Sequence, residues 1–474
     1  MEHSLPTDIY QPERAIDEIA DFIADPVRPA EFPAHILRFR NDRTAATVGL
    51  DGLGDEEWIA HFGRFEPLPD AQPEPLALRY HGHQFRVYNP DLGDGRGFLF
   101  AQLRESAVAG GRLLDLGTKG SGLTPWSRTA DGRLTLKGGV REILATEMLE
   151  ALGVTTSRTF SLIETGEALV RGDEPSPTRS AVLVRLNHGH IRIGSFQRLA
   201  YHGDTETLRR LIDYSLKHLL ERDAGENAAL TLLETVVERT ADLAASYMVA
   251  GFVHGVLNSD NIAITAESFD YGPWRFTPRW EPGFTAAYFD QTGLYAFARQ
   301  AEAIHWDVAQ LAQSLVGLAE TDALVEMLRR YPALYESRLI ARFLWRLGLE
   351  APNDEAARTF VVAAVEALRD SPVQIDRFFF DWRRAEGDGP LYAGAAWDKA
   401  RGAITALTMR EDAGDHPYWR GEAPCSMHID EVETIWNAIA ERDDWAPLDE
   451  KVAAIRAMGA AHGPFSIHHN PASS

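Results

Sequence analysis

Apolar and polar residues alternate in two different ways along the chain, and the pattern changes near residue 200. Before that point, short apolar runs bounded by turn residues predict strands over residues 113–118, 157–163 and 180–186. One helix is predicted among them, over residues 139–152, because apolar residues recur at helical spacing and a glycine follows. Later, helical spacing extends over residues 205–220 and 228–251. This order of elements predicts an α+β fold in which a small β-rich part containing one helix precedes a larger helical part.

Proline-rich joints set apart a third region at the start of the chain. The first 75 residues mix short helical patterns with prolines, and residues 65–75 form the clearest linker. We therefore expect an N-terminal extension over residues 1–75 and a small lobe over residues 76–200. Residues 201–474 are expected to form a helical lobe that ends in a C-terminal helical extension.

Charge limits the classes of partner. The 474 residues include 47 basic and 70 acidic ones, a formal net charge of -23. Such a charge argues against bulk attraction to nucleic acid or to an anionic membrane, so we expect neither as a partner. A bound phosphate must then be held by a local cluster of basic side chains.

Cysteine content and apolar runs bear on the compartment. Cys425 is the single cysteine, which excludes an intrachain disulfide and a cysteine-based zinc site. The longest apolar runs, such as residues 181–184, are far shorter than the roughly 20 residues of a membrane span. Residues 1–19 are acidic and interrupted by prolines, unlike a secretory or transit signal. We expect a cytoplasmic protein.

A glycine-rich stretch is the first segment that points to chemistry. Apolar and aromatic runs at residues 85–88 and 97–103 predict a β-hairpin whose tip carries Gly93, Gly95 and Arg96. Glycines let backbone amides approach phosphate groups closely. A plain tight hairpin with no ligand is the alternative, because this signal is weak by itself.

Two charged residues extend this pattern. Lys119 follows on a predicted strand and Glu142 on the predicted helix. A glycine-rich loop, a strand lysine and a helix glutamate occur in this order in the small lobe of protein kinases, where the glutamate fixes the lysine that neutralises phosphates. Taken singly, each is more often a solvated surface residue.

A second group of residues follows the long predicted helix. Residues 254–261 read HGVLNSDN, and Asp270 begins a D-x-G sequence nine residues later. In kinases the corresponding loop supplies a base and a metal-binding asparagine, and the later aspartate binds Mg²⁺. Val256 stands where the kinase base is expected, so Asp260 is the nearest replacement, with a turn or cap role as its alternative. Oxygen ligands from Asn261 and Asp270 suit Mg²⁺ or Mn²⁺.

Two arginines lie where the β-rich part gives way to the helical part. Arg185 and Arg192 flank the His-Gly-His sequence of residues 188–190. The planar guanidinium group suits phosphate oxygens, although a solvated or salt-bridged role is the alternative for each. No further metal-ligating residue follows these histidines at ligand spacing, so we assign them to packing or hydrogen bonding.

These segments resemble the selenoprotein O family. The motifs that carry the resemblance are GHQF at 82–85, LGDGR at 92–96, KGSGLTPWSR at 119–128, DGR at 131–133, RE at 141–142, HIRIG at 190–194, HGVLNSDN at 254–261 and DYGP at 270–273. The resemblance covers about residues 35–320, including the helical pattern at 306–315. It implies a two-lobed, protein-kinase-like pseudokinase fold and protein AMPylation, in which AMP passes from ATP to Ser, Thr or Tyr hydroxyls of proteins and pyrophosphate is released.

The resemblance also implies a role for each matched residue. Asp260 matches the proton acceptor, while Asn261 and Asp270 match the ligands of Mg²⁺ or Mn²⁺. The ATP-contacting positions are matched by Gly93, Gly95, Arg96, Lys119, Asp131, Gly132, Arg185, Arg192 and Asp270. Glu142 matches the structural partner of the lysine. In the family the nucleotide lies reversed relative to ordinary kinases, so the α-phosphate faces the reaction centre.

Three features depart from the family pattern. Ala472 stands where members commonly carry selenocysteine or cysteine, and Arg86 stands where a glycine is usual. The region after about residue 330 looks shortened and fits the family poorly. These departures bear on regulation and on the choice of protein substrate, while the catalytic set is complete. Two alternatives to an adenylyltransferase stay open as well: a kinase-type phosphotransferase that uses Asp260, and an inactive pseudokinase scaffold that binds nucleotide.

Overall fold

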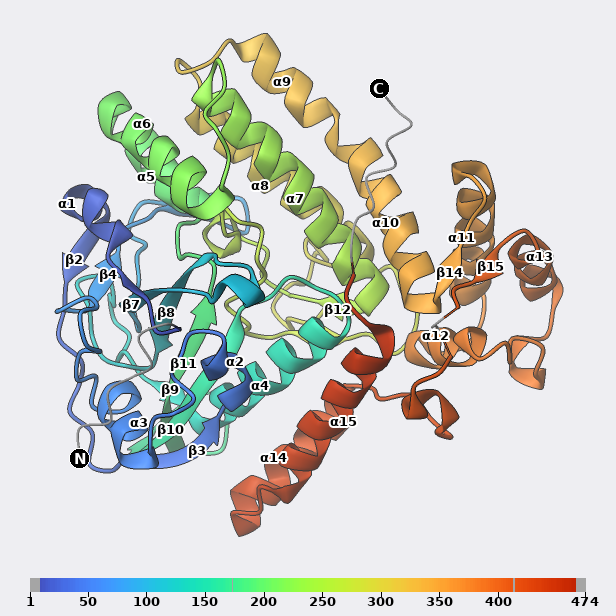
Figure 1. Cartoon of the computed structure of the whole chain (residues 1–474), viewed down its shortest axis with the longest axis horizontal. Helices are drawn as coiled ribbons and strands as arrows, with labels where there is room; N and C mark the ends of the chain where they lie inside the picture. The colour runs from blue at the N-terminus through green and yellow to red at the C-terminus, as the bar shows by residue number, and fades with distance from the viewer. Residues whose placement is uncertain (1–8, 173, 412–413, 466–474) are drawn as a thin grey trace.

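A large antiparallel sheet forms one side of the molecule, and a group of long helices forms the other (Figure 1). The structure, a computed structural model, describes residues 9–172, 174–411 and 414–465. Within these ranges the sheet has nine strands, in the order β2-β4-β7-β8-β11-β10-β3, with β1 beside β7 and β9 beside β11. Its strands are β1 (Pro12–Glu13), β2 (Ala24–Pro26), β3 (Ile36–Arg40), β4 (Leu76–Leu78), β7 (Leu99–Arg104), β8 (Leu113–Lys119), β9 (Leu134–Thr135), β10 (Arg158–Leu169) and β11 (Thr178–Asn187).

The remaining strands pair in short two-stranded ladders. They are β5 (Gly82–Gln84) with β6 (Val87–Asn89), β12 (Phe252–Val253) with β13 (Arg275–Phe276), and β14 (Leu349–Glu350) with β15 (Thr408–Met409). The α-helices are α1 (Ala20–Ile23), α2 (Asp42–Ala46), α3 (Asp55–Phe62), α4 (Leu136–Ala151), α5 (Ile193–Tyr201), α6 (Thr205–Tyr214), α7 (Ala228–Ala250), α8 (Gln300–Ser314), α9 (Thr321–Arg329), α10 (Tyr331–Leu347), α11 (Asp354–Arg369), α12 (Ile375–Arg383), α13 (Ala395–Ile404), α14 (Ile429–Arg442) and α15 (Ala446–His462).

Most elements expected from the sequence are present, so the prediction of a mixed α and β fold is confirmed. The three predicted strands correspond to β8, β10 and β11, which lie side by side in the sheet. The predicted helix over residues 139–152 corresponds to α4, and that over residues 228–251 corresponds to α7. Helix α7 ends at Gly251, whose φ of 69° is the left-handed conformation that favours glycine at helix C-termini.

The predicted hairpin around the glycine-rich stretch is wrong. The strand near residues 85–88 is β6, which pairs antiparallel with the preceding strand β5 through a two-residue turn at Phe85 and Arg86. Strand β7 pairs with β8 instead. Strand β5 is separated from β6 by only two residues, so closing the turn between them costs little conformational entropy. Pairing of β6 with β7 would require residues 90–98 to form a longer loop, which costs more. Gly93 therefore lies in an irregular loop that bridges to Arg79 instead of at a hairpin tip.

The first 75 residues contribute to the same sheet as the residues that follow them. Strand β3 pairs with β10, β1 pairs with β7, and β2 pairs with β4. Helix α3 buries Trp58 and Phe62 against Phe160 of β10, with ring centroids 4.9 and 5.1 Å from that phenylalanine. The division at residue 75 stays a prediction, with strands on both sides of it hydrogen-bonded in one sheet.

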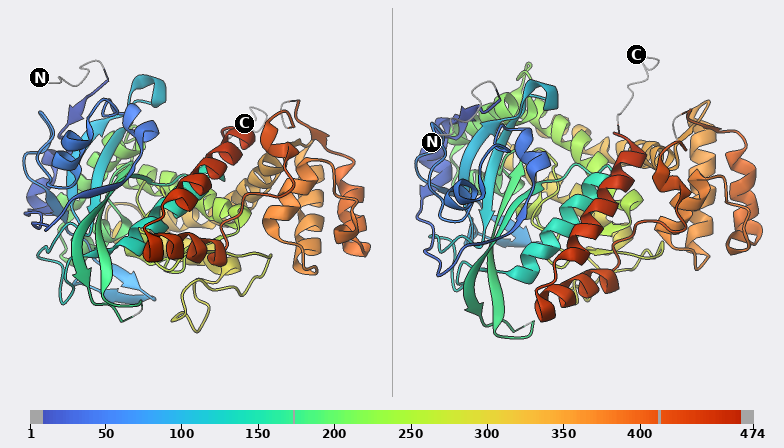
Figure 2. Two further views of the ribbon diagram at one scale, coloured as in Figure 1. Left: turned by 90° about the horizontal axis from the view of Figure 1, so that it is seen from below. Right: turned by 60° about the horizontal axis from the view of Figure 1, so that its bottom comes forward.

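The two last helices return to the sheet side of the molecule and pack along α4. Figure 2 shows α14 and α15 beside this helix, and Arg456 of α15 donates two hydrogen bonds to Glu147 of α4, at 2.8 and 2.6 Å. The position of Ala472 lies outside the described residues. Over the described ranges, no helix combines the length and the apolar character that crossing a bilayer demands.

Candidate active site

A polar cavity of about 390 Å³ lies where the central strands meet the loop after α7. Eight of the residues expected from the sequence line it: Gly93, Gly95, Arg96, Lys119, Arg185, Asp260, Asn261 and Asp270. Val256, which occupies the position of the kinase base, lines it as well. The fold therefore brings the glycine-rich loop, the strand lysine and the HGVLNSDN segment to one cavity.

Lys119 and Glu142 form an ion pair at the inner end of this cavity. Lys119 is the last residue of β8, and its Nζ contacts Oε1 of Glu142 on α4. Their side chains are only 6% and 2% exposed, so water screens the pair little. Lys119 Nζ also lies 3.6 Å from Oδ1 of Asp270. The pair thus aims a fixed positive charge at the cavity.

Asp270 is surrounded by cationic groups. Arg185 Nη1 donates to its Oδ1 at 2.8 Å, and Arg192 Nη1 lies 3.4 Å from its Oδ2. Burial by itself would raise the pKa of Asp270, but the positive charges of Arg185, Lys119 and Arg192 outweigh it and hold the pKa well below the ordinary value. Asp270 therefore stays ionised at neutral pH. Its φ of 60° lies in the left-handed region, which non-glycine residues adopt uncommonly.

Arg192 connects the two acidic residues of the site. Its Nη1 donates to the backbone oxygen of Asp260 at 3.0 Å, and its Nη2 lies 3.3 Å from Asp94 in the glycine-rich loop. The guanidinium group stacks on Tyr80, 4.1 Å from the ring centroid. Arg192 is 1% exposed and lies behind the lining residues. It fixes the HGVLNSDN segment against the glycine-rich loop.

One oxygen of the Asp260 carboxylate has no hydrogen-bond partner among the described residues. Asp260 lies on a short 3-10 turn (Ser259–Asn261), and its Oδ1 is buried with no hydrogen bond to any described group. Burial raises the pKa of Asp260 to about 6, although the charge of Arg192 acts in the opposite direction. A carboxylate with this pKa is ionised at neutral pH and basic enough to accept a proton from a nearby hydroxyl.

Asn261 keeps its side-chain oxygen toward ligands. Its Nδ2 donates to the backbone oxygen of Val256 at 2.9 Å, which fixes the amide and leaves Oδ1 as the free acceptor. Among the described residues, no group of three or more His, Cys, Asp or Glu side chains is arranged to hold a metal. The oxygen donors of Asn261 and Asp270 would hold a hard cation only together with oxygens of a ligand.

Sequence reasoning missed the residues that hold the HGVLNSDN loop in place. Asn258 Oδ1 accepts hydrogen bonds from the backbone N–H of Phe85, at 3.1 Å, and from the Tyr295 hydroxyl, at 2.7 Å. Ser259 Oγ accepts from the backbone N–H of His83 at 2.8 Å. The short β5–β6 hairpin is thus docked on the loop. The GHQF motif is the only signal of it in the sequence, and that motif names no chemistry by itself.

Two glycines of the site are required by close packing, whether or not a ligand is bound. A Cβ at Gly82 would lie 2.8 Å from the Cβ of Asp260, and one at Gly93 would lie 2.3 Å from Cγ of Trp126. Both distances are shorter than van der Waals contact. Gly82 therefore sets how closely β5 packs on Asp260, and Trp126 of the KGSGLTPWSR segment covers the glycine-rich loop.

Asp131 and Gly132 do not line the cavity. Asp131 accepts from Arg171 Nη1 at 2.8 Å, and its side chain is 48% exposed. Gly132 has a φ of 71° and packs against Gly122. The neighbouring Ala130 does line the cavity, so the two residues lie just beyond its edge. A contact of either residue with nucleotide stays a prediction.

The family follows from comparison with known proteins. The family model described as "Protein adenylyltransferase SelO" matches residues 9–394. A relative from Synechocystis sp., called protein nucleotidyltransferase YdiU, is 40% identical over 94% of this chain and 98% of its own length. A relative of the same name from Synechococcus elongatus is 43% identical over 93% of both chains.

The likeness extends further than the motifs indicate. A third relative called protein nucleotidyltransferase YdiU, from Gloeobacter violaceus, is 42% identical over 94% of this chain and 95% of its own. The expectation that the resemblance ends near residue 320 is therefore wrong, because the family model extends to residue 394 and these relatives match 94% of this chain. The chain belongs to the SelO family and is an enzyme of the nucleotidyltransferase class.

Proposed function

We propose that this protein is a two-lobed, kinase-like adenylyltransferase that transfers AMP from ATP to serine, threonine or tyrosine hydroxyls of other proteins. One observation carries the proposal: the buried carboxylate of Asp260, whose Oδ1 has no hydrogen-bond partner among the described residues, lines the same cavity as Lys119 and Asp270. The sheet with α4 would be the small lobe, over residues 76–200, and the helices of residues 201–474 the large lobe. Residues 1–75 would be an extension of the small lobe.

The cavity offers several groups that suit the phosphates of ATP. Backbone amides at Gly93 and Gly95 and the side chain of Arg96 line one wall. Lys119 and Arg185 place positive charge on another wall, and buried charge of this kind stabilises an anionic leaving group more strongly than charge in water. Asp131 and Gly132 would contact the nucleotide beyond the edge of the cavity.

The proposed transfer needs one base and one leaving group. The oxygen of an acceptor hydroxyl attacks the α-phosphorus of ATP and forms a new P–O bond, while the bond from that phosphorus to the bridging oxygen of pyrophosphate breaks. The electron pair leaves with pyrophosphate, whose charge Lys119, Arg185 and Arg192 would neutralise. The proton of the hydroxyl passes to the carboxylate of Asp260, which is basic enough to receive it.

A divalent cation, Mg²⁺ or Mn²⁺, fits the donors of this cavity. The side-chain oxygens of Asn261 and Asp270 are hard ligands, and both residues line the cavity. Bound there with ATP, the cation would neutralise phosphate charge. Glu142 takes no part in this binding, because its carboxylate is held by Lys119.

The position of the transferred label tests the proposal. The protein is incubated with Mg²⁺ or Mn²⁺ and with ATP labelled at either the α- or the γ-phosphate, together with proteins that present accessible hydroxyls. We expect protein-bound label from the α position alone. Label from the γ position alone would instead identify a kinase-type phosphotransferase, which the same carboxylate would serve. Binding of ATP without transfer of either label would identify a nucleotide-binding scaffold.

A methyl group at Gly82 is expected to disturb the base. In the Gly82→Ala variant the new Cβ meets Asp260 Cβ and Oδ1, each at 2.8 Å, so the carboxylate must move by several tenths of an ångström. Because small misplacements of a reacting group are costly, we expect kcat for AMP transfer to fall by about tenfold to a hundredfold. ATP binding, measured by calorimetry, should change little. Gly52→Ala is the matched control, since no atom lies within 4 Å of its added Cβ; equal rates in both variants would refute the role of Gly82.

A further inference from the structure

A second polar cavity, of about 260 Å³, lies between the sheet and α7. Seven separate segments of the chain form its walls, and the residues that matter here are Arg112, His188, Arg239, Asp242, Glu267 and Arg342. It shares no lining residue with the cavity that holds Asp260. One water molecule occupies about 30 Å³ in the liquid, so this space has room for a larger polar ligand.

Three arginines and three carboxylates, those of Glu221, Asp242 and Glu267, line this cavity, and one of the arginines has no close carboxylate partner among the described residues. Arg342 is neutralised by Asp242, to which it donates two hydrogen bonds, at 2.7 and 2.6 Å. Arg112 is paired with Glu105, at 2.9 and 3.2 Å. Arg239, in contrast, has no carboxylate oxygen within 4 Å among the residues that the structure describes. A guanidinium group that has no carboxylate in contact and lines a half-open cavity can take an anion as its partner.

Hydrogen bonding of Arg239 leaves part of its guanidinium group for a ligand. Its Nη2 donates to the backbone oxygen of Leu220 at 3.0 Å, and this is the one acceptor found for it in the described part of the chain. A guanidinium group carries five N–H donors in a planar fork that matches two oxygens of a phosphate. Arg112 lines the same cavity and adds a second set of N–H donors, although its charge is already paired with Glu105.

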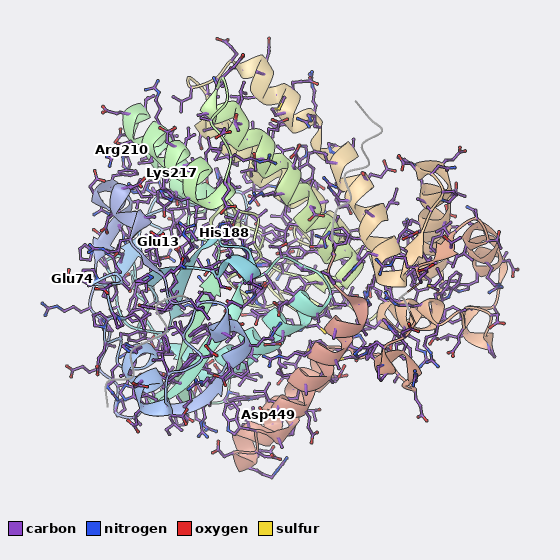
Figure 3. The ribbon with its side chains drawn as sticks, in the orientation of Figure 1. Glu13, Glu74, His188, Arg210, Lys217 and Asp449 are labelled. Atoms are coloured by element: carbon purple, nitrogen blue, oxygen red, sulfur yellow. The ribbon has the colours of Figure 1, made fainter. Side chains whose placement is uncertain are left out.

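His188 supplies an acceptor beside these donors. The residue is 6% exposed, and its ring Nε2 is buried without any hydrogen-bond partner. Burial, together with the charges of Arg112 and Arg239, lowers the pKa of the ring to about 4, so the imidazole is neutral at pH 7. Figure 3 labels His188 near the centre of the view, and the small exposed fraction of this residue places it in the interior. A neutral imidazole has one acceptor nitrogen, which can take a hydrogen bond from an O–H group.

Glu267 adds a second acceptor at the same wall. Its Oε2 accepts the backbone N–H of His188 at 2.6 Å, and its carboxyl group lines the cavity. A ligand that satisfies all these groups must offer negatively charged oxygens to Arg112 and Arg239 and an O–H to His188 or Glu267. A phosphate group that retains one proton has both, whereas sulfate at neutral pH has acceptors alone.

We propose that this cavity binds a protonated phosphate group through Arg112, Arg239 and His188. The source is inorganic phosphate or pyrophosphate, and the second of these is the leaving group of nucleotidyl transfer. The site is independent of which acceptor the enzyme modifies, so it does not rest on the proposed AMPylation of proteins. Glu221, which also lines the cavity, is exposed to solvent and leaves the positive charge of Arg239 unpaired.

The walls of this cavity continue into the candidate active site. His188 lines the phosphate cavity, while His190, two residues further on, lines the cavity of Asp260 and contacts Asp115 at 3.0 Å. Glu267 likewise precedes Asp270 by three residues. Between them, the backbone N–H of Ser268 donates a hydrogen bond of 2.9 Å to a backbone oxygen on the sheet side. A bound phosphate would therefore stiffen two segments that carry active-site residues.

Calorimetric titration of the full chain with sodium phosphate tests the proposal. The candidate active site is first saturated with Mg²⁺ and an ATP analogue that resists cleavage at the α-phosphate, so that phosphate cannot bind there. We expect one phosphate to bind per chain with a dissociation constant below about 10 mM. Sulfate at equal ionic strength should bind at least about tenfold more weakly. Pyrophosphate is titrated in the same way. Tighter binding of pyrophosphate would identify the leaving group as the source, and tighter binding of phosphate the free ion.

Matched variants separate the cavity from general charge. Arg239→Gln should weaken phosphate binding by at least about tenfold, whereas Arg209→Gln, which removes an equal charge from the exposed surface of α6, should leave it unchanged. If Arg239→Gln does not fold, Arg239→Lys replaces it in the test. This variant keeps the positive charge but loses the planar pair of N–H donors, so it should bind phosphate with intermediate affinity. Absence of any phosphate binding, equal weakening in the Arg209 variant, or equal binding of sulfate and phosphate would overturn the proposal.

Discussion

Asp260→Asn is expected to lower kcat for nucleotidyl transfer by about a hundredfold to ten-thousandfold, because the variant keeps the shape of the side chain and loses the proton acceptor. Binding of ATP with Mg²⁺ should persist, since the cavity keeps Lys119, Arg185 and Asp270. The protein should be at least as stable as the parent at pH 7. Burial raises the pKa of Asp260 to about 6, so ionisation of this residue at neutral pH opposes folding, and the neutral amide removes that cost.

The pH profile distinguishes a base from a merely structural residue. In the parent enzyme kcat/KM should fall as the pH drops through about 6, where Asp260 takes up a proton. The low activity of Asp260→Asn should lack this acidic limb. Asp322→Asn, at an exposed position of α9, is the matched control and should reproduce the parent profile. Unchanged turnover in Asp260→Asn, or an acidic limb that persists in it, would exclude Asp260 as the base.

Chain order was enough to predict which residues meet, but not how they are held. Lys119 and Glu142 lie 23 positions apart, and Asp270 lies far from both, yet the kinase-like sequence of elements predicts that they share a site. Strands β8 and β11 could be predicted from their continuous apolar runs. Both faces of these strands are buried, so their residues do not alternate between apolar and polar. The ion pairs in the cavity follow from these strands and α4.

Other features depend on contacts that local sequence does not encode. The hydrogen bond from His83 N–H to Ser259 spans 176 positions, and neither residue carries a charge or a periodic pattern that would reveal it. The predicted hairpin around the glycine-rich stretch is wrong because the chain turns earlier, at Phe85 and Arg86, whose φ angles are 50° and 63°. Neither residue type favours this left-handed conformation, so the sequence does not indicate a turn there. Glycine adopts such angles freely, which gives a physical reason for the glycine expected at position 86.

Asp270→Asn is expected to abolish transfer and to destabilise the protein, and the two effects have one cause. Arg185 has Asp270 as its ion-pair partner within the described ranges, and Lys119 and Arg192 also lie within 4 Å of this carboxylate. Without the carboxylate, Arg185 loses its ion-pair partner, while Lys119 keeps Glu142 and Arg192 keeps Asp94. Removal of one partner from a buried ion pair typically costs about 3–5 kcal/mol, so we expect unfolding at lower temperature and denaturant concentration.

ATP should repair the stability of this variant without restoring its activity. The triphosphate brings negative charge to the same cations, so ATP in the presence of a chelator should raise the melting temperature of Asp270→Asn more than that of the parent. Transfer with Mg²⁺ should still be at least about a thousandfold slower, because the variant lacks an ionised ligand for the cation. Asp398→Asn, whose side chain is 70% exposed, is the control for loss of one acidic charge and should match the parent in both measurements. Phosphate charge can replace the carboxylate only where it lies close to the same cations. If ATP raises the melting temperature of Asp270→Asn less than that of the parent, these cations do not face the triphosphate.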